Sequence, residues 1–84
     1  MAVKESLTIV VNGKAVEVDV NENAPLRTAI PKALHESQNQ GQPPENWELR
    51  DADGNLLDLH KKIGAYGFTD QTKLFLNLKA GVGG

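Results

Sequence analysis

The chain has 84 residues, of which 39% are hydrophobic and 24% charged, with a formal net charge of −2 and no cysteine. This length fits one small domain, and an acidic chain without a basic run argues against a nucleic-acid partner. Without cysteine, the chain has no disulfide, thiolate nucleophile or sulfur-ligated metal. Because the sequence shows neither a signal peptide nor an apolar stretch long enough to span a membrane, we expect a cytoplasmic protein without membrane attachment.

The first predicted unit is a β-hairpin. Apolar and polar residues alternate over residues 7–11 and again over 15–20, which is typical of two half-buried strands. Asn12-Gly13 lies between them, and both residues tolerate positive φ, so a two-residue type I′ turn is favoured. This turn would fix the strand register, with large aliphatic side chains on one face. The predicted pairs are Val11 with Lys14, Ile9 with Val16, and Leu7 with Val18.

A helix is predicted next. Asn23 is placed to cap its start and Pro25 suits its first turn. Pro31 interrupts this pattern because it lacks an amide proton, so we expect either a kink or a helix that begins after Pro25. Residues 38–45, which include Gly41 and Pro43-Pro44, form a loop. The predicted buried face of the helix recurs at helical spacing and comprises Leu26, Ala29, Ile30, Ala33 and Leu34.

The second half of the chain returns to strand patterns. Residues 47–50 alternate, with Trp47 expected in the core, and residues 51–55 form a turn. Leu56-Leu57 is predicted as a brief strand, and Asp58 as the cap of a short helical turn that runs to Ile63 and is ended by Gly64 and Gly67. Residues 73–79 form the most regular strand, with Leu74, Leu76 and Leu78 on one side. One sheet packed on one helix is the economical arrangement of these elements, an α+β fold.

The last five residues contain three glycines and no surface to bury. Residues 1–79 are therefore predicted to be the domain, and residues 80–84 to be a flexible tail. The tail comprises Ala80, Gly81, Val82, Gly83 and Gly84.

The order of these elements resembles ubiquitin and its relatives over nearly the whole chain. The similarity is clearest in Thr72-Lys-Leu-Phe-Leu-Asn-Leu-Lys79 followed by Gly83-Gly84, and in Pro43-Pro44 after the helix. The resemblance implies a ubiquitin-like β-grasp fold, with a mixed sheet of four to five strands packed on one helix. Pro31 and a tail without arginine differ from ubiquitin itself. The sequence is more similar to the small modifiers of bacterial operons that also encode ubiquitination-like enzymes.

This resemblance implies a protein modifier that is not itself an enzyme. An E1-like activating enzyme would adenylate the Gly84 carboxylate with ATP, an E2-like conjugating enzyme would transfer the acyl group to a target amine through an isopeptide bond, and a JAB-type or other protease would remove it. Gly83 and Gly84 suit a narrow active-site channel because they lack a Cβ. Two alternatives remain open: a sulfur carrier with a C-terminal thiocarboxylate, and a binding module that never reacts at its tail.

The body of the domain would then supply partner recognition. Phe75 points away from the leucine face of its strand, and in a β-grasp sheet the first and last strands are neighbours. Phe75 should therefore lie near Val10 and Thr8, with Asn77 on the same face, as a partner-binding surface. Isolated exposed apolar residues are also common without function.

No catalytic, cofactor or metal site is predicted. His35 and His60 lack nearby cysteines or a repeated carboxylate spacing, so a metal site is not expected. Asp51, Asp53 and Asn55 have the beginning of a calcium-loop pattern, but the required glycine and terminal glutamate are out of place. A tight turn explains these residues better. No nucleophile, base and orienting group can be assembled from the sequence.

Overall fold

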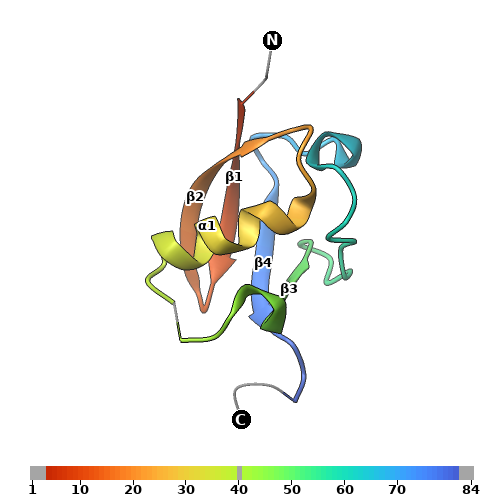
Figure 1. Cartoon of the computed structure of the whole chain (residues 1–84). Helices are drawn as coiled ribbons and strands as arrows, with labels where there is room; N and C mark the ends of the chain where they lie inside the picture. Colours follow the sequence, from red (N-terminus) through yellow and green to blue (C-terminus); the bar gives the residue numbers. More distant parts are fainter. Residues whose placement is uncertain (1–3, 40, 82–84) are drawn as a thin grey trace.

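The computed structural model describes residues 4–39 and 41–81 of the chain. They form one four-stranded sheet with a single α-helix across one face (Figure 1). The strands are β1 (Lys4–Val11), β2 (Lys14–Asn21), β3 (Trp47–Arg50) and β4 (Lys73–Leu78). The α-helix is α1 (Ala29–Glu36), and the 3₁₀ helices are η1 (Leu26–Thr28), η2 (Pro44–Asn46) and η3 (Ile63–Tyr66).

The sheet is mixed, and its last strand is central. The strand order is β2-β1-β4-β3; β1 and β4 are parallel and the other two pairs are antiparallel. The predicted neighbourhood of the first and last strands is therefore confirmed. It follows that β4 is hydrogen-bonded to a neighbouring strand on both sides. Because β4 runs parallel to β1, its C-terminal end lies at the same end of the sheet as the hairpin turn (Figure 1).

The hairpin has the predicted register. Val11 pairs with Lys14, Ile9 with Val16, and Leu7 with Val18. Asn12 and Gly13 have φ values of 51° and 82°, as a type I′ turn requires. The local turn chemistry and the alternating pattern thus specify the same pairing, which places the aliphatic side chains of both strands beneath the helix.

The helix begins later than Pro25 and is not kinked by Pro31. η1 occupies residues 26–28, and Pro31 is the third residue of α1. At that position a backbone N–H has no acceptor within the helix, so the missing proton of proline costs little. The predicted cap is wrong: no side chain caps η1 or α1, and Asn23 instead donates its backbone N–H to the Asn21 side chain at 2.8 Å.

The core lies between the helix and one face of the sheet. All five apolar residues predicted for the buried face of the helix are buried, as is Trp47, so these predictions are confirmed. Burial of apolar surface at about 25 cal/mol per Å² is the main favourable term for such a small domain. The strands supply most of the remaining large side chains of this cluster and η3 adds Ile63; those on strands include Leu7, Ile9, Val11, Leu49, Leu74 and Leu76.

The connection from β3 to β4 differs from the prediction. Leu56 forms only an isolated antiparallel bridge to Arg50, so the predicted Leu56-Leu57 strand is absent. The helical segment is η3, which begins at Ile63, where the prediction had it end. Asp58 accepts a hydrogen bond from the backbone N–H of His60 at 2.9 Å and thus stabilises a turn rather than a helix start. Gly67, with φ of 68°, ends η3 as an αL residue.

Two glycines provide a matched test of the hairpin turn. A Cβ added to Gly13 or to Gly41 would meet no atom within 4 Å, but only Gly13 has positive φ. We therefore expect Gly13→Ala to lower the free energy of unfolding by about 1–2 kcal/mol through left-handed backbone strain. Gly41→Ala should leave it unchanged or raise it by about 0.5 kcal/mol. Urea denaturation measures both variants, and equal midpoints would contradict the strained-turn account.

Candidate functional site

The tail leaves the body at the end of β4. The backbone N–H of Lys79 donates to the Asn46 carbonyl at 2.8 Å, which ties this residue to η2. Ala80 and Gly81 follow as an exposed turn, and Gly81 has φ of 88°. Val82, Gly83 and Gly84 lie outside the described residues. The central strand therefore continues directly into the segment on which the proposed chemistry depends.

The predicted partner-binding residues share the face of the sheet that the helix leaves open. Val10 and Phe75 are register partners on β1 and β4, and both are half-buried. Thr8, also half-buried, lies two residues before Val10 on the same strand. Asn77 is exposed and pairs with Glu48 of β3. The structure brings Phe75 and Val10 together, and it places Thr8 and Asn77 toward opposite ends of this face.

A single row of side chains crosses this open face, and only part of it was predicted. Ala15 pairs with Val10, Val10 with Phe75, Phe75 with Arg50, and Arg50 with Leu56. Register partners present their side chains on the same side of a sheet. We call these five residues the cross-sheet row. Leu56, at 60% exposure, is the one large apolar residue in the described parts of the chain that is mostly open to solvent.

Arg50 is held in place within the row. Its Nε donates to the Glu48 carboxylate at 2.7 Å, and a terminal guanidinium nitrogen donates to the Gly54 carbonyl at 2.8 Å. The Arg50 side chain remains 42% exposed, so solvent screens this ion pair and its contribution to stability is small. These two hydrogen bonds fix the orientation of the Arg50 guanidinium. The row therefore has a cation at Arg50 with an apolar side chain on each side of it, Phe75 and Leu56.

The turn after β3 places Leu56. The Asp51 carboxylate accepts hydrogen bonds from the backbone N–H groups of Asp53 and Asn55, both at 2.9 Å, and from the Asn55 side-chain amide at 3.2 Å. The hydrogen bond from the Asn55 backbone is the largest cause that holds the pKa of Asp51 below its ordinary value of 3.8. The tight turn predicted for residues 51–55 is therefore closed by Asp51, and no group of three or more metal-ligating side chains gathers in the described ranges.

The hydrogen bonds of Asp51 make the stability of the domain depend on pH. Because the folded pKa of Asp51 is lowered, the stabilisation it provides is present above its ordinary pKa of 3.8 and is lost as pH falls through the folded pKa. We expect Asp51→Asn to reduce stability at pH 7 and to flatten its dependence on pH below about 4. Denaturation from pH 2 to 7 measures this, with Asp53→Asn as the control. An unchanged slope in Asp51→Asn would contradict the role of this carboxylate.

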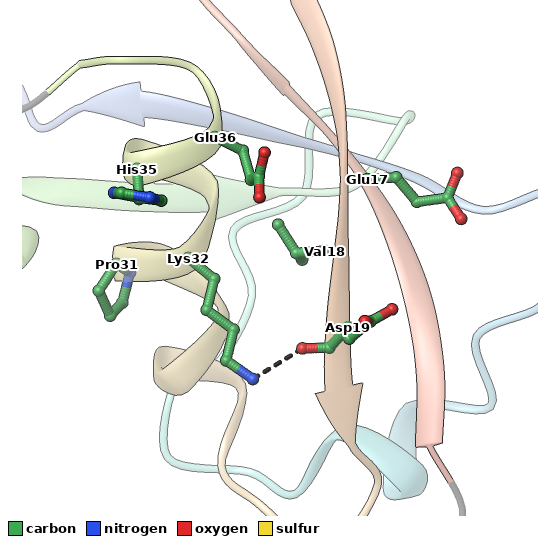
Figure 2. A pocket seen from close by; sticks show the side chains of 7 residues that line it. All are labelled: Glu17, Val18, Asp19, Pro31, Lys32, His35 and Glu36. Atoms are coloured by element: carbon green, nitrogen blue, oxygen red, sulfur yellow. Dashed lines mark hydrogen bonds between the residues drawn. The ribbon is translucent and has the colours of Figure 1, made fainter.

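A separate groove lies between α1 and the edge strand β2. Figure 2 shows Lys32 reaching from α1 to the backbone of β2, where its Nζ donates to the Asp19 carbonyl at 2.7 Å. The hairpin register directs the backbone groups of Ala15, Glu17 and Asp19 toward this open edge. Lys32 therefore covers one outward carbonyl of the edge strand, a charged protection against further strand pairing. Glu17, Asp19 and Glu36 line this groove together with Lys32 and His35.

Sequence reasoning missed Ala15, Arg50 and Leu56 as members of the row. The alternation over residues 47–50 already places Arg50 on the face opposite the core, but its partner on β4 depends on pairing between distant segments.

No helix among residues 4–39 and 41–81 is long and apolar enough to cross a membrane.

The arrangement of the sheet and helix is that of ubiquitin-like β-grasp domains. A designed protein based on ubiquitin matches with a TM-score of 0.74 and 21% identity over 96% of this chain and 95% of its own. Ubiquitin from Caldiarchaeum subterraneum matches with 0.72 and 24% over 96% and 99%. The ubiquitin-like domain of an Arabidopsis thaliana protein matches with 0.68 and 20% over 92% and 79%. These identities establish the fold alone.

The chain belongs to DUF2604, a family described as a protein of unknown function, whose model matches residues 3–84. An uncharacterized protein of Sinorhizobium fredii, y4jI, is 51% identical over 81 residues. That match covers 96% of this chain, and the chain spans 62% of the length of this relative.

Proposed function

We propose that this chain is a ubiquitin-like protein modifier that reacts at the carboxylate of Gly84. The observation that carries the proposal is the continuity of β4 with the tail: the strand that is paired on both edges leads through Lys79 into the glycine-rich segment. The family match includes residues 80–84, so the tail falls within the part of the sequence that defines the family. In this role the chain is a substrate of other enzymes and catalyses nothing itself.

The chemistry requires activation because a free carboxylate is a poor acyl donor. A carboxylate oxygen of Gly84 attacks the α-phosphate of ATP, which forms an acyl-adenylate and releases pyrophosphate. A cysteine thiolate of the E1-like enzyme then attacks the acyl carbon and displaces AMP. After transfer to the E2-like enzyme, a target amine attacks the thioester, so an amide forms and the thiolate leaves. Because the chain has no cysteine, every thiol in this series of reactions comes from a partner enzyme.

The cross-sheet row supports the recognition that such transfer needs. It combines the half-buried Phe75 and Val10 with the exposed Leu56 and an oriented Arg50. Aromatic residues and arginine are enriched where protein surfaces bind one another. The same row also favours the second candidate function, a binding module that uses the open sheet face and never reacts at its end.

The tail reaction leaves a specific chemical trace. Trypsin cleaves after Lys79, so a conjugated target lysine would retain the branch Ala-Gly-Val-Gly-Gly on its ε-amine. We expect tagged protein incubated with ATP in a lysate of its source cells to yield such branched peptides by mass spectrometry. Gly84→Val should abolish them because a branched side chain blocks a narrow channel. Gly41→Val adds the same side chain in open space and should retain them.

The outcomes separate the candidate functions. Branched peptides that depend on ATP and on Gly84 would support conjugation. A tail in which sulfur replaces a carboxylate oxygen, without branched peptides, would show a sulfur carrier instead. An unmodified tail and no branched peptide in the wild-type sample would contradict both tail chemistries and leave the binding module.

The row predicts a second, separable effect. Leu56→Asp places a charge within the row, beside Arg50, whereas Ala52→Asp adds the same charge at an exposed position outside the row. We expect Leu56→Asp to lower the yield of branched peptides about tenfold, equivalent to about 1.4 kcal/mol of binding. Both variants should stay within about 0.5 kcal/mol of wild-type stability because both sites are exposed. Equal yields from the two variants would show that the row does not contact the transfer enzymes.

A further inference from the structure

A hollow of about 260 Å³ lies beside the point where the chain leaves β4, on the side of the molecule that carries the helix. η2 and the end of β4 meet here, joined by the hydrogen bond from Lys79 to Asn46 (Figure 1). Small-molecule sites usually measure about 300–1,000 Å³, so this hollow suits one or two side chains rather than a whole cofactor. It is lined by Arg27, Ile30, Pro44, Glu45, Trp47, Leu59, His60 and Lys79.

The base of the hollow is apolar and fixed. Ile30 and Trp47 are buried, and Leu59 is half-buried. The Arg27 backbone N–H donates to the Leu59 carbonyl at 2.9 Å, which ties η1 to the segment before η3. The Trp47 indole N–H donates to the Gln42 carbonyl at 3.4 Å. These contacts leave an aromatic and aliphatic surface with its polar groups already partnered.

The rim of the hollow is basic although the chain is acidic overall. Arg27, His60 and Lys79 come from three separate segments, and each is exposed. Glu45 is the one acidic residue in the lining, and within the described portion of the chain it makes no ion pair with any of the three. The cationic side chains of Arg27 and Lys79 are thus available to a ligand, with the His60 imidazole as a further hydrogen-bonding group.

We propose that this hollow binds an acidic segment of a partner protein. A carboxylate of the segment pairs with Arg27 and Lys79, and a neighbouring apolar side chain packs on Trp47 and Leu59. Charge complementarity selects the acidic residue, and the apolar base selects a segment that also carries a large hydrophobic residue. The inference depends on this surface and not on the tail chemistry, although a partner bound here lies next to the tail.

The test uses the whole ¹⁵N-labelled protein and two blocked hexapeptides, Glu-Asp-Leu-Phe-Asp-Glu and its uncharged analogue Gln-Asn-Leu-Phe-Asn-Gln. In an NMR titration we expect the acidic peptide to shift the Trp47 indole signal and the amides of Leu59, His60 and Lys79. The double variant Arg27→Gln, Lys79→Gln should bind it about three- to tenfold more weakly, since each exposed ion pair contributes up to about 1 kcal/mol.

A matched pair of cations provides the control. Lys14→Gln with Lys73→Gln removes the same charge from exposed positions outside the hollow and should retain the affinity. The dispersion of the NMR spectrum verifies that each variant is folded. The proposal is overturned if the acidic peptide produces no shifts at millimolar concentration, if the uncharged analogue binds as well, or if the control pair weakens binding equally. Equal shifts with inorganic phosphate would likewise overturn it, because they would show a simple anion site.

Discussion

The parallel pairing of β1 with β4 is the constraint on which the rest of the structure depends. It brings the two ends of the chain into adjacent strands, with Ile9 beside Leu74 and Val11 beside Leu76 on the buried face. The same register sets Val10 beside Phe75 on the open face. One set of backbone hydrogen bonds therefore closes the core and assembles the middle of the cross-sheet row. Because these contacts join residues that are far apart in the sequence, the domain must bury substantial apolar surface to offset the conformational entropy lost on bringing them together.

β4 connects two surfaces on opposite sides of the molecule. It contributes Phe75 to the cross-sheet row, and Lys79, which follows the strand directly, lines the basic hollow. Both surfaces are built from side chains of the folded body, whereas the proposed chemistry takes place on the tail that follows. Such a division is physically reasonable for a modifier, because recognition benefits from fixed side chains while an acyl donor must enter a partner's active site.

Local patterns predicted the local elements. Asn12-Gly13 and the alternation around it determine the hairpin register, and apolar spacing identifies the buried residues of α1. The row and the hollow depend on pairing between distant segments: only after the sheet has formed does Phe75 lie beside Arg50, and do Arg27 and Lys79 line the same hollow. The connection after β3 was predicted poorly because Leu56-Leu57 has an apolar strand pattern, yet the Asp51 turn allows Leu56 only a single bridge. Strand propensity is a weak guide at such a sheet edge.

Native-state amide hydrogen exchange tests the central role of the β1–β4 pairing most directly. If β4 is the strand on which the fold depends, the amides that join β1 to β4 should exchange only through global unfolding, with the highest protection in the molecule. Amides on the outer edge of β2 and at Ala80 and Gly81 should exchange much faster. Protection of β4 below that of the β1–β2 hairpin would contradict the account, because the hairpin and not the central pair would then hold the domain together.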